Sequence, residues 1–180
     1  MPDPIQVLFD EHDIIKSVIA TAEHTAMLIG DDEIRYEKTV RKLLDFFRNY
    51  ADKYHHYKEE VILFPEMSKK NELLQNGVIQ EMLENHTDFR EMLKSIENFL
   101  DKKDYRHADQ QLGIYCEALL DHIAVENEEV FQMADSLFGP DELEKMYFRF
   151  NDCDAELGGT TKNDLVKMAV ELRMELANTK

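Results

Sequence analysis

The chain has 180 residues with a formal net charge of −17, and only four prolines and six glycines interrupt it. This length is typical of one domain with a substantial core, and the abundance of Leu, Glu, Met and Lys favours an all-helical fold. The acidity argues against nucleic-acid binding, because phosphate contacts need clustered Lys and Arg.

Two further features bear on the compartment in which the protein works. Only Cys116 and Cys153 occur, too few for a disulfide framework or a thiolate metal site, so we expect a reducing environment. The first residues lack a basic region followed by an apolar run, and no stretch approaches ~20 apolar residues, so neither secretion nor membrane spanning is expected. The sequence therefore predicts a cytoplasmic protein without membrane contacts.

Apolar residues recur at helical spacing along four long stretches of the chain. The first expected helix has Asp3 as its cap and Pro4 at its first helical position, an arrangement that favours helix initiation. The four expected helices span residues 4–29, 33–64 (with a short continuation to residue 74), 77–100 and 105–137. Short connections make such helices antiparallel neighbours, so we expect an up-down-up-down four-helix bundle.

A Gly-Pro pair ends the fourth helix, and two shorter, strongly charged helices are expected after it, over residues 141–157 and 161–178. The chain would then consist of a four-helix bundle, residues 1–138, and a C-terminal helical appendage, residues 139–180. The appendage either packs on the bundle or forms a dimer contact.

The second helix contains two overlapping His-x-x-x-Glu pairs, His55 with Glu59 and His56 with Glu60. Residues i and i+4 lie on the same side of a helix, so each pair can present an imidazole and a carboxylate to one metal. At ~100° per residue, the first pair falls at the edge of the apolar arc and the second lies about 100° farther round. We therefore expect His55 and Glu59 to face inward, and His56 and Glu60 to form an outer, solvated pair.

Position along each helix predicts height in the bundle, at ~1.5 Å per residue. Six polar side chains then reach one interior layer, namely His12, His55, Glu59, His86, His122 and Glu126. A lone inward histidine is more often a hydrogen-bonded core residue, so the prediction depends on all six together. Burying them is costly unless a partner neutralises the carboxylates and accepts the imidazole lone pairs, as a metal does. His24 and His107 fall outside the layer and are expected in solvent.

The ligand types narrow the choice of metal. Four imidazoles and two carboxylates exceed what one tetrahedral zinc needs, and they lack the thiolates of a structural zinc site. Two carboxylates among four histidines can bridge a pair of metals, each of which also holds two imidazoles. Mixed nitrogen and oxygen ligation in a helical bundle suits two iron ions, with manganese or zinc as alternatives.

Four segments carry a family resemblance: Glu11-His12, the block from His55 to Pro65, Glu84-Asn85-His86, and His122-x-x-x-Glu126-Asn127. Over about residues 1–138 the chain resembles the hemerythrin-like proteins of the HHE cation-binding group, which are non-haem di-iron four-helix bundles. The resemblance implies four terminal ligands, His12, His55, His86 and His122. It also implies that Glu59 and Glu126 bridge the two irons, together with a solvent bridge.

One position departs from the oxygen-carrying members of that family. They have a second histidine four residues after the first in the third helix, where this chain has Arg90. The resemblance therefore implies four histidine ligands and an open position on each metal. Two interpretations of Arg90 stay open: it places a cation near a bound anion, or it points past the site and pairs with a surface carboxylate.

We expect a non-haem di-iron protein that binds or senses O2, NO or peroxide at a bridged centre. Two alternatives stay open: a redox enzyme that turns over peroxide or NO at the same centre, and a regulatory module in which the metal state alters the packing of the last two helices. The sequence marks no general acid, nucleotide site or electron-partner surface, so it does not decide whether the protein is an enzyme. The expected partners are a small diatomic or peroxide ligand and, as an open alternative, a second copy of the chain.

Overall fold

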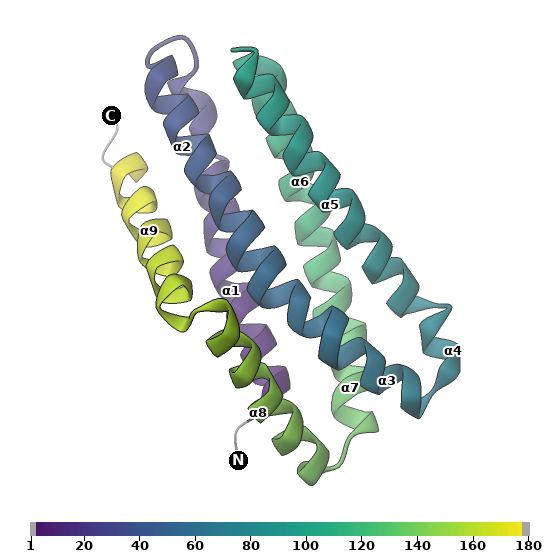
Figure 1. The fold of residues 1–180 in the computed structure, drawn as a ribbon. Helices are drawn as coiled ribbons and strands as arrows, with labels where there is room; N and C mark the ends of the chain where they lie inside the picture. The colour runs from purple at the N-terminus through teal and green to yellow at the C-terminus, as the bar shows by residue number, and fades with distance from the viewer. Residues whose placement is uncertain (1–2, 178–180) are drawn as a thin grey trace.

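The computed structural model of the protein describes residues 3–177, leaving aside the side chains of residues 159 and 160. The described residues form helices and no strand, and the long helices run alternately up and down (Figure 1). Each of the four long segments of the bundle, here called a rod, consists of consecutive helices. The first rod is α1 (Pro4–Ala22), followed by the 3-10 turn η1 (Thr25–Leu28). The second rod comprises α2 (Glu33–Phe46), the π-helices η2 (Phe47–His56) and η3 (Glu59–Leu63), and α3 (Phe64–Lys70). Residues 33–70 are helical without a break.

The remaining rods follow the expected order. The third rod is the short α4 (Glu72–Gln75) with α5 (Val78–Asp101), and the fourth is α6 (Tyr105–Val125), the π-helix η4 (Glu126–Val130) and α7 (Phe131–Leu137). The C-terminal helices α8 (Pro140–Leu157) and α9 (Gly159–Ala177) follow. The predicted all-α, up-down-up-down four-helix bundle with two additional C-terminal helices is confirmed. The first helix is shorter than expected, since it gives way to the 3-10 turn, and the expected last residue of the sixth, Asn178, lies outside the described residues.

Aspartates begin three of the long rods. A carboxylate oxygen of Asp3 accepts a hydrogen bond from the backbone N–H of Ile5, and Asp32 accepts one from that of Arg35. Asp104 caps α6 in the same way. Each cap satisfies a backbone donor that the first helical turn leaves without a partner, so these residues fix where the rods start.

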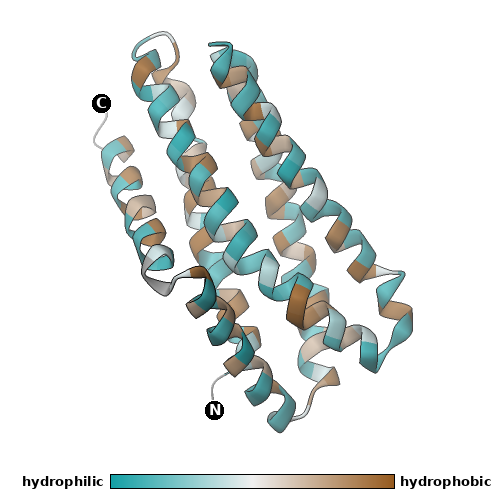
Figure 2. Cartoon of the chain, viewed as in Figure 1, coloured by the Kyte–Doolittle hydropathy of each residue, from teal (hydrophilic) through white to brown (hydrophobic). Residues whose placement is uncertain are grey.

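The hydrophobic core is divided by a polar layer. On α1, Leu8 belongs to one apolar cluster and Ile15 to another, with His12 between them. On α5, Met82 and Phe89 flank His86 in the same manner. The outward surfaces of α2 and α5 are mostly hydrophilic (Figure 2). The layer therefore crosses the bundle between two dry clusters of side chains.

The C-terminal helices pack along the bundle. α9 contacts α1, α2 and η2, whereas α8 contacts α1, η2 and η3, on the side of the bundle away from α5 (Figure 1). The apolar stripe of α9 joins the larger core cluster through Leu165, Ala169, Leu172 and Leu176. The division at residue 138 stays a prediction, because α9 shares the core of the four-helix bundle.

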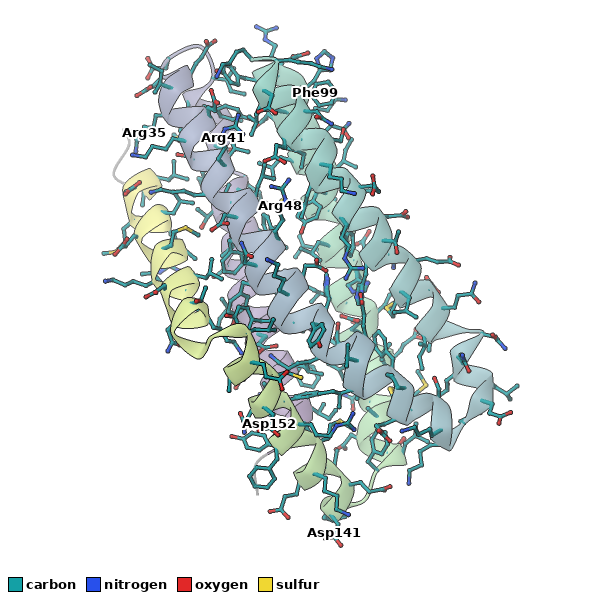
Figure 3. All side chains as sticks on the ribbon, viewed as in Figure 1. Arg35, Arg41, Arg48, Phe99, Asp141 and Asp152 are labelled. Atoms are coloured by element: carbon teal, nitrogen blue, oxygen red, sulfur yellow. The ribbon has the colours of Figure 1, made fainter. Side chains whose placement is uncertain are left out.

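Ion pairs between partly exposed side chains join the second rod to α5. Arg41 and Arg48, labelled in Figure 3, lie 2.7 Å from Asp101 and 2.6 Å from Glu97. Such partly exposed pairs contribute little to stability. Both pairs lie on the same side of the polar layer, because Arg41 and Arg48 precede His55 along the second rod, whereas their partners follow His86 along α5. No helix in the described part of the chain is long and apolar enough to cross a membrane.

Candidate metal centre

The six side chains that the sequence predicts to share a layer meet inside the bundle. Each is buried, with no more than 2% of its surface exposed: His12 on α1, His55 and Glu59 on the second rod, His86 on α5, and His122 and Glu126 on the fourth rod. The two exposed histidines, His24 and His107, lie outside this layer, as expected. The predicted convergence of four helices on one level is therefore confirmed.

Glu126 lies between two imidazoles. Its Oε2 atom is 3.2 Å from Nε2 of His12 and 3.2 Å from Nε2 of His122. Burial works to raise the pKa of Glu126, but the neighbouring His122 and His12 outweigh it and hold the pKa well below its ordinary value. Glu126 is thus a charged carboxylate in the interior.

Glu59 occupies the equivalent position between the other two rods. Its Oε1 atom is 3.5 Å from Nε2 of His55, and its Oε2 atom is 3.7 Å from Nε2 of His86. Burial, together with the nearby charge of Glu126, raises the pKa of Glu59 well above its ordinary value. One oxygen of Glu59 lies within 4.8 Å of one oxygen of Glu126. Two buried carboxylates at this distance favour a cation between them.

His56 does not face solvent, so the expectation that it belongs to an outer pair is wrong. Its side chain is 2% exposed, and its ring stacks on that of His86 with centroids 3.8 Å apart. One ring nitrogen from each of His56, His86 and His122 lies within 4.8 Å of the others. The Nε2 atoms of His86 and His122 are 3.1 Å apart. A fifth imidazole therefore joins the layer.

The π-helical conformation of η2 explains the error. A π-helix closes its hydrogen bonds between residues i and i+5, so a turn takes more residues and each residue rotates by less than the ~100° of an α-helix. His55 and His56, at the end of η2, both turn toward the interior as a result. Hydrophobic periodicity assumes α-helical geometry throughout, and nothing in the residue pattern marks where the π-helix lies.

The outer ring nitrogens of the four predicted histidine ligands also have polar neighbours. His86 Nδ1 donates to Glu60 at 2.8 Å, so Glu60, expected in solvent, supports the layer from its edge. The other three contacts join His12 Nδ1 to Asn127 Oδ1 at 2.8 Å, His55 Nδ1 to Glu11 Oε2 at 3.0 Å, and His122 Nδ1 to the Asn85 amide nitrogen at 3.4 Å. The three oxygen acceptors orient their imidazoles and leave the inner nitrogen for a metal. The Asn85 amide nitrogen is a donor, so Nδ1 of His122 accepts in that contact.

Arg90 pairs with carboxylates and does not enter the layer. Its guanidinium donates to Asp52 at 2.8 Å and to Glu60 at 2.7 Å. Because the same Glu60 oxygen accepts from His86, and Asp52 lies 3.6 Å from Nδ1 of His56, Arg90 reaches the layer through these two carboxylates. This arrangement agrees with the second interpretation of Arg90, a partner of carboxylates at the edge of the bundle.

Burial lowers the pKa of three of the buried histidines. It lowers the pKa of His55 to about 4, where the nearby His12 adds to the effect. It lowers the pKa of His56 and His86 too, so both rings favour the neutral form near pH 7. A neutral imidazole has the free lone pair that metal coordination requires.

The buried atoms without hydrogen-bond partners fit a metal centre. In the described part of the chain, those within the layer are Nε2 of His12, Nε2 of His55, Nδ1 of His56 and all four carboxylate oxygens of Glu59 and Glu126. Buried polar atoms in proteins are almost always paired, so this group needs an explanation. Imidazole nitrogens with carboxylate oxygens are a donor set that iron, manganese and zinc accept.

The fold and this cluster define a class: helical bundles with an interior set of histidines and carboxylates that could hold metal ions. Within that class the chain belongs to the hemerythrin family, since residues 3–134 match the family model described as the hemerythrin HHE cation-binding domain. A search of curated proteins found no match. The match ends before α8 and α9, so the family model does not cover the helices that pack against α1 and η2.

Proposed function

We propose that the protein holds two iron ions in the polar layer and uses them to bind or sense O2, NO or peroxide. The proposed ligands are His56 and the six residues that the sequence predicts, which are His12, His55, Glu59, His86, His122 and Glu126. Glu59 and Glu126 would bridge the two ions. Manganese or zinc would suit the same donors, and elemental analysis of protein from its native host separates these metals.

One observation carries this proposal: the carboxylate oxygens of Glu59 and Glu126 are buried and have no hydrogen-bond partner. An uncompensated buried carboxylate pair is costly. A pair of divalent or trivalent cations compensates the charge of both and accepts the lone pairs of the surrounding imidazoles. The membership of residues 3–134 in the hemerythrin HHE family supports the same conclusion.

His56 makes the proposed ligand set asymmetric. Together with His86 and His122 it gives one ion three imidazole donors, whereas the other ion has two, from His12 and His55. The ion with fewer protein donors is the one at which a small exogenous ligand is expected to bind. His56 would thereby provide a fifth imidazole from the second rod, in place of the histidine that oxygen-carrying members of the family have at the position of Arg90.

The iron pair would supply the electrons that are exchanged with O2, NO or peroxide. The chain itself excludes water and orients the imidazoles. Phe131 stacks on His12 with ring centroids 5.2 Å apart, and Phe89 meets His122 edge-on at 5.2 Å. These rings and the two apolar clusters keep the layer dry, which strengthens each electrostatic contact within it.

Metal stoichiometry tests the proposal. Protein loaded anaerobically with Fe2+ and then freed of excess metal should contain two irons per chain, and oxidation should produce the near-ultraviolet absorption of a bridged ferric pair. His55→Ala and Glu59→Ala should abolish both signals, whereas the exposed control His24→Ala should leave them unchanged. One iron per chain, or none, at full loading would overturn the di-iron proposal.

Binding and turnover are separated by a second measurement. If the protein binds or senses the ligand, exposure to NO or O2 should change the absorption of the loaded protein, and removal of the gas should reverse the change. If it is an enzyme, it should consume many equivalents of peroxide or NO per chain, and Glu126→Ala should abolish that consumption. Sustained consumption would favour the enzyme alternative over the proposal of binding or sensing.

A further inference from the structure

A cluster of four charged side chains, here named the charge cluster, lies beside the polar layer. It consists of Glu11 on α1, Lys58 on the second rod, Asp154 on α8 and Lys162 on α9. The Oε1 atom of Glu11 is 2.5 Å from Nζ of Lys58 and 2.5 Å from Nζ of Lys162. Asp154 completes the cluster, 2.9 Å from Lys58 and 2.5 Å from Lys162. Two positive and two negative charges thus balance.

The burial of this charge cluster makes its pairing important. Lys58 is fully buried, Glu11 is 3% exposed, and the side chain of Lys162 is 17% exposed. Removing a charged group from water costs several kcal/mol per ion unless opposite charges compensate it. Half of the compensation here comes from α8 and α9, so the bundle alone would leave the ammonium of Lys58 with one carboxylate instead of two.

The charge cluster touches the polar layer through Glu11. Its Oε2 atom accepts the hydrogen bond from Nδ1 of His55, which fixes the tautomer of that ring and leaves Nε2 directed toward Glu59. The other oxygen of the same carboxylate, Oε1, accepts hydrogen bonds from both lysines. The orientation of the His55 ring therefore depends on where Lys58 and Lys162 hold Glu11.

A second contact joins the same region of the second rod to the α8–α9 corner. The hydroxyl of Tyr54, the residue before His55, lies 2.9 Å from the carbonyl oxygen of Leu157 and 2.7 Å from that of Gly158. The Nζ atom of Lys162 lies over the ring of Tyr54, 5.8 Å from its centroid. The corner is thus held by residues that directly neighbour proposed ligands.

We propose that Asp154 and Lys162 are positioning residues for the metal centre, and that they couple metal loading to the docking of α9 on the bundle. The inference rests on the proposed function, because it needs a metal at His55. Coupling of this kind is reciprocal: if docked α9 holds Glu11 and His55 in the orientation that binds metal, then metal must stabilise docked α9 by the same free energy.

Hydrogen exchange of the full chain tests the coupling without any substitution. Backbone amides of α9 should exchange more slowly in the iron-loaded protein than in the metal-free protein. The matched variants are Lys162→Met, which removes one charge from the charge cluster, and Lys167→Met, which removes an exposed charge from the same helix. The difference between loaded and metal-free protein should vanish in Lys162→Met, persist in Lys167→Met and return in Lys162→Arg.

Iron retention gives an independent readout. Release of iron to a chelator should be roughly 10-fold faster or more in Lys162→Met and in Asp154→Asn, the effect typical of substitutions behind a metal ligand. The control for the second variant is Asp152→Asn, whose exposed side chain on α8 is labelled in Figure 3. This control should release iron at the wild-type rate.

The outcomes distinguish this inference from the proposed function. If wild-type protein fails to load two irons, the proposed function fails, whatever α9 does. If it loads two irons but α9 exchanges equally fast with and without metal, and Lys162→Met and Asp154→Asn retain iron as wild type does, the coupling is overturned and the proposed function stands. The wild-type comparison decides the coupling even if Lys162→Met fails to fold.

Discussion

The Oε1 atom of Glu60 lies 2.8 Å from Nδ1 of His86, so a glutamate at the edge of the bundle accepts a hydrogen bond from a proposed metal ligand. The same oxygen accepts from Arg90 at 2.7 Å. Although burial works to raise the pKa of Glu60, its contacts with His86 and Arg90 hold it below its ordinary value. Glu60 therefore stays charged and keeps the proton of His86 on the outer nitrogen.

Glu60→Gln should weaken iron retention without preventing loading. Glutamine keeps the size of the side chain but loses the charge that fixes His86, and substitutions behind a metal ligand typically cost 10–100-fold in affinity. We expect about 10-fold faster loss of iron to a chelator. Glu81→Gln, at an exposed position on α5, the helix that carries His86, is the control. Equal rates for the two variants would show that Glu60 does not support the centre.

His56→Phe should affect one iron of the pair. Phenylalanine can keep the stacking on His86, whereas it removes the nitrogen donor. With three imidazoles on one ion and two on the other, the Mössbauer spectrum of the wild-type protein should contain two quadrupole doublets of equal area. His56→Phe should shift one of them, and the exposed His107→Phe should shift neither. A single doublet in the wild-type protein would contradict the asymmetric ligand set.

Glu59→Gln should stabilise the metal-free protein while it abolishes metal loading. The amide cannot ionise, so the variant removes the cost of a buried, unpartnered charge wherever Glu59 is ionised, typically about 1–3 kcal/mol. A gain of that size raises the melting temperature by roughly 2–4 °C per kcal/mol for a chain of this length. The comparison needs carefully stripped protein, since bound metal reverses the order of stabilities.

The pH dependence of that gain follows from the raised pKa of Glu59. In the folded metal-free protein this pKa lies well above the ordinary 4.5, so the folded state holds a proton that the unfolded chain has released. Its contribution to stability is therefore complete below pH 4.5 and is lost as the pH rises through the folded-state pKa. Melting curves should show the advantage of Glu59→Gln growing with pH. An advantage that shrinks as the pH rises would contradict the raised pKa of Glu59.

Lys58→Met should destabilise the fold although methionine has a similar length. Lys58 is fully buried between Glu11 and Asp154, and removing one partner of a buried charge pair typically costs about 3–5 kcal/mol. Urea unfolding of the metal-free protein measures this cost. The control is Lys53→Met, at an exposed position one turn earlier, which should stay within about 0.5 kcal/mol of wild type.

The sequence predicts the bundle and its polar layer for a physical reason. Helix length and short connections determine where antiparallel helices lie side by side, so His12 and His86 can be placed at one height without coordinates. A distorted helix also changes its rise per residue, but a side chain displaced along the helix axis still points into the same interior. Height is therefore the robust part of such a prediction, and the six residues chosen by height all reach the layer.

Rotation about the helix axis is the part that the sequence could not predict. A rotation summed over residues accumulates any departure from α-helical geometry, and the ten residues of η2 end at His56. The charge cluster was missed for another reason: on α8 and α9, Asp154 and Lys162 are two charges among many. Only the tertiary packing separates them from residues such as Asp152, which faces solvent.

The π-helical segments have a consequence for how this chain tolerates length changes. η3 begins at Glu59 and η4 begins at Glu126, so both proposed bridging carboxylates open a stretch in which the helix carries more residues per turn. Deleting one residue from such a stretch would let it relax into an ordinary α-helix, at no cost in backbone hydrogen bonds. The downstream residues would then keep nearly the same phase against the rest of the bundle, because a π-helical turn holds one residue more than an α-helical turn. A one-residue deletion should therefore be tolerated in η3 or η4 better than in an ordinary α-helix, where it would rotate every later side chain by about 100°.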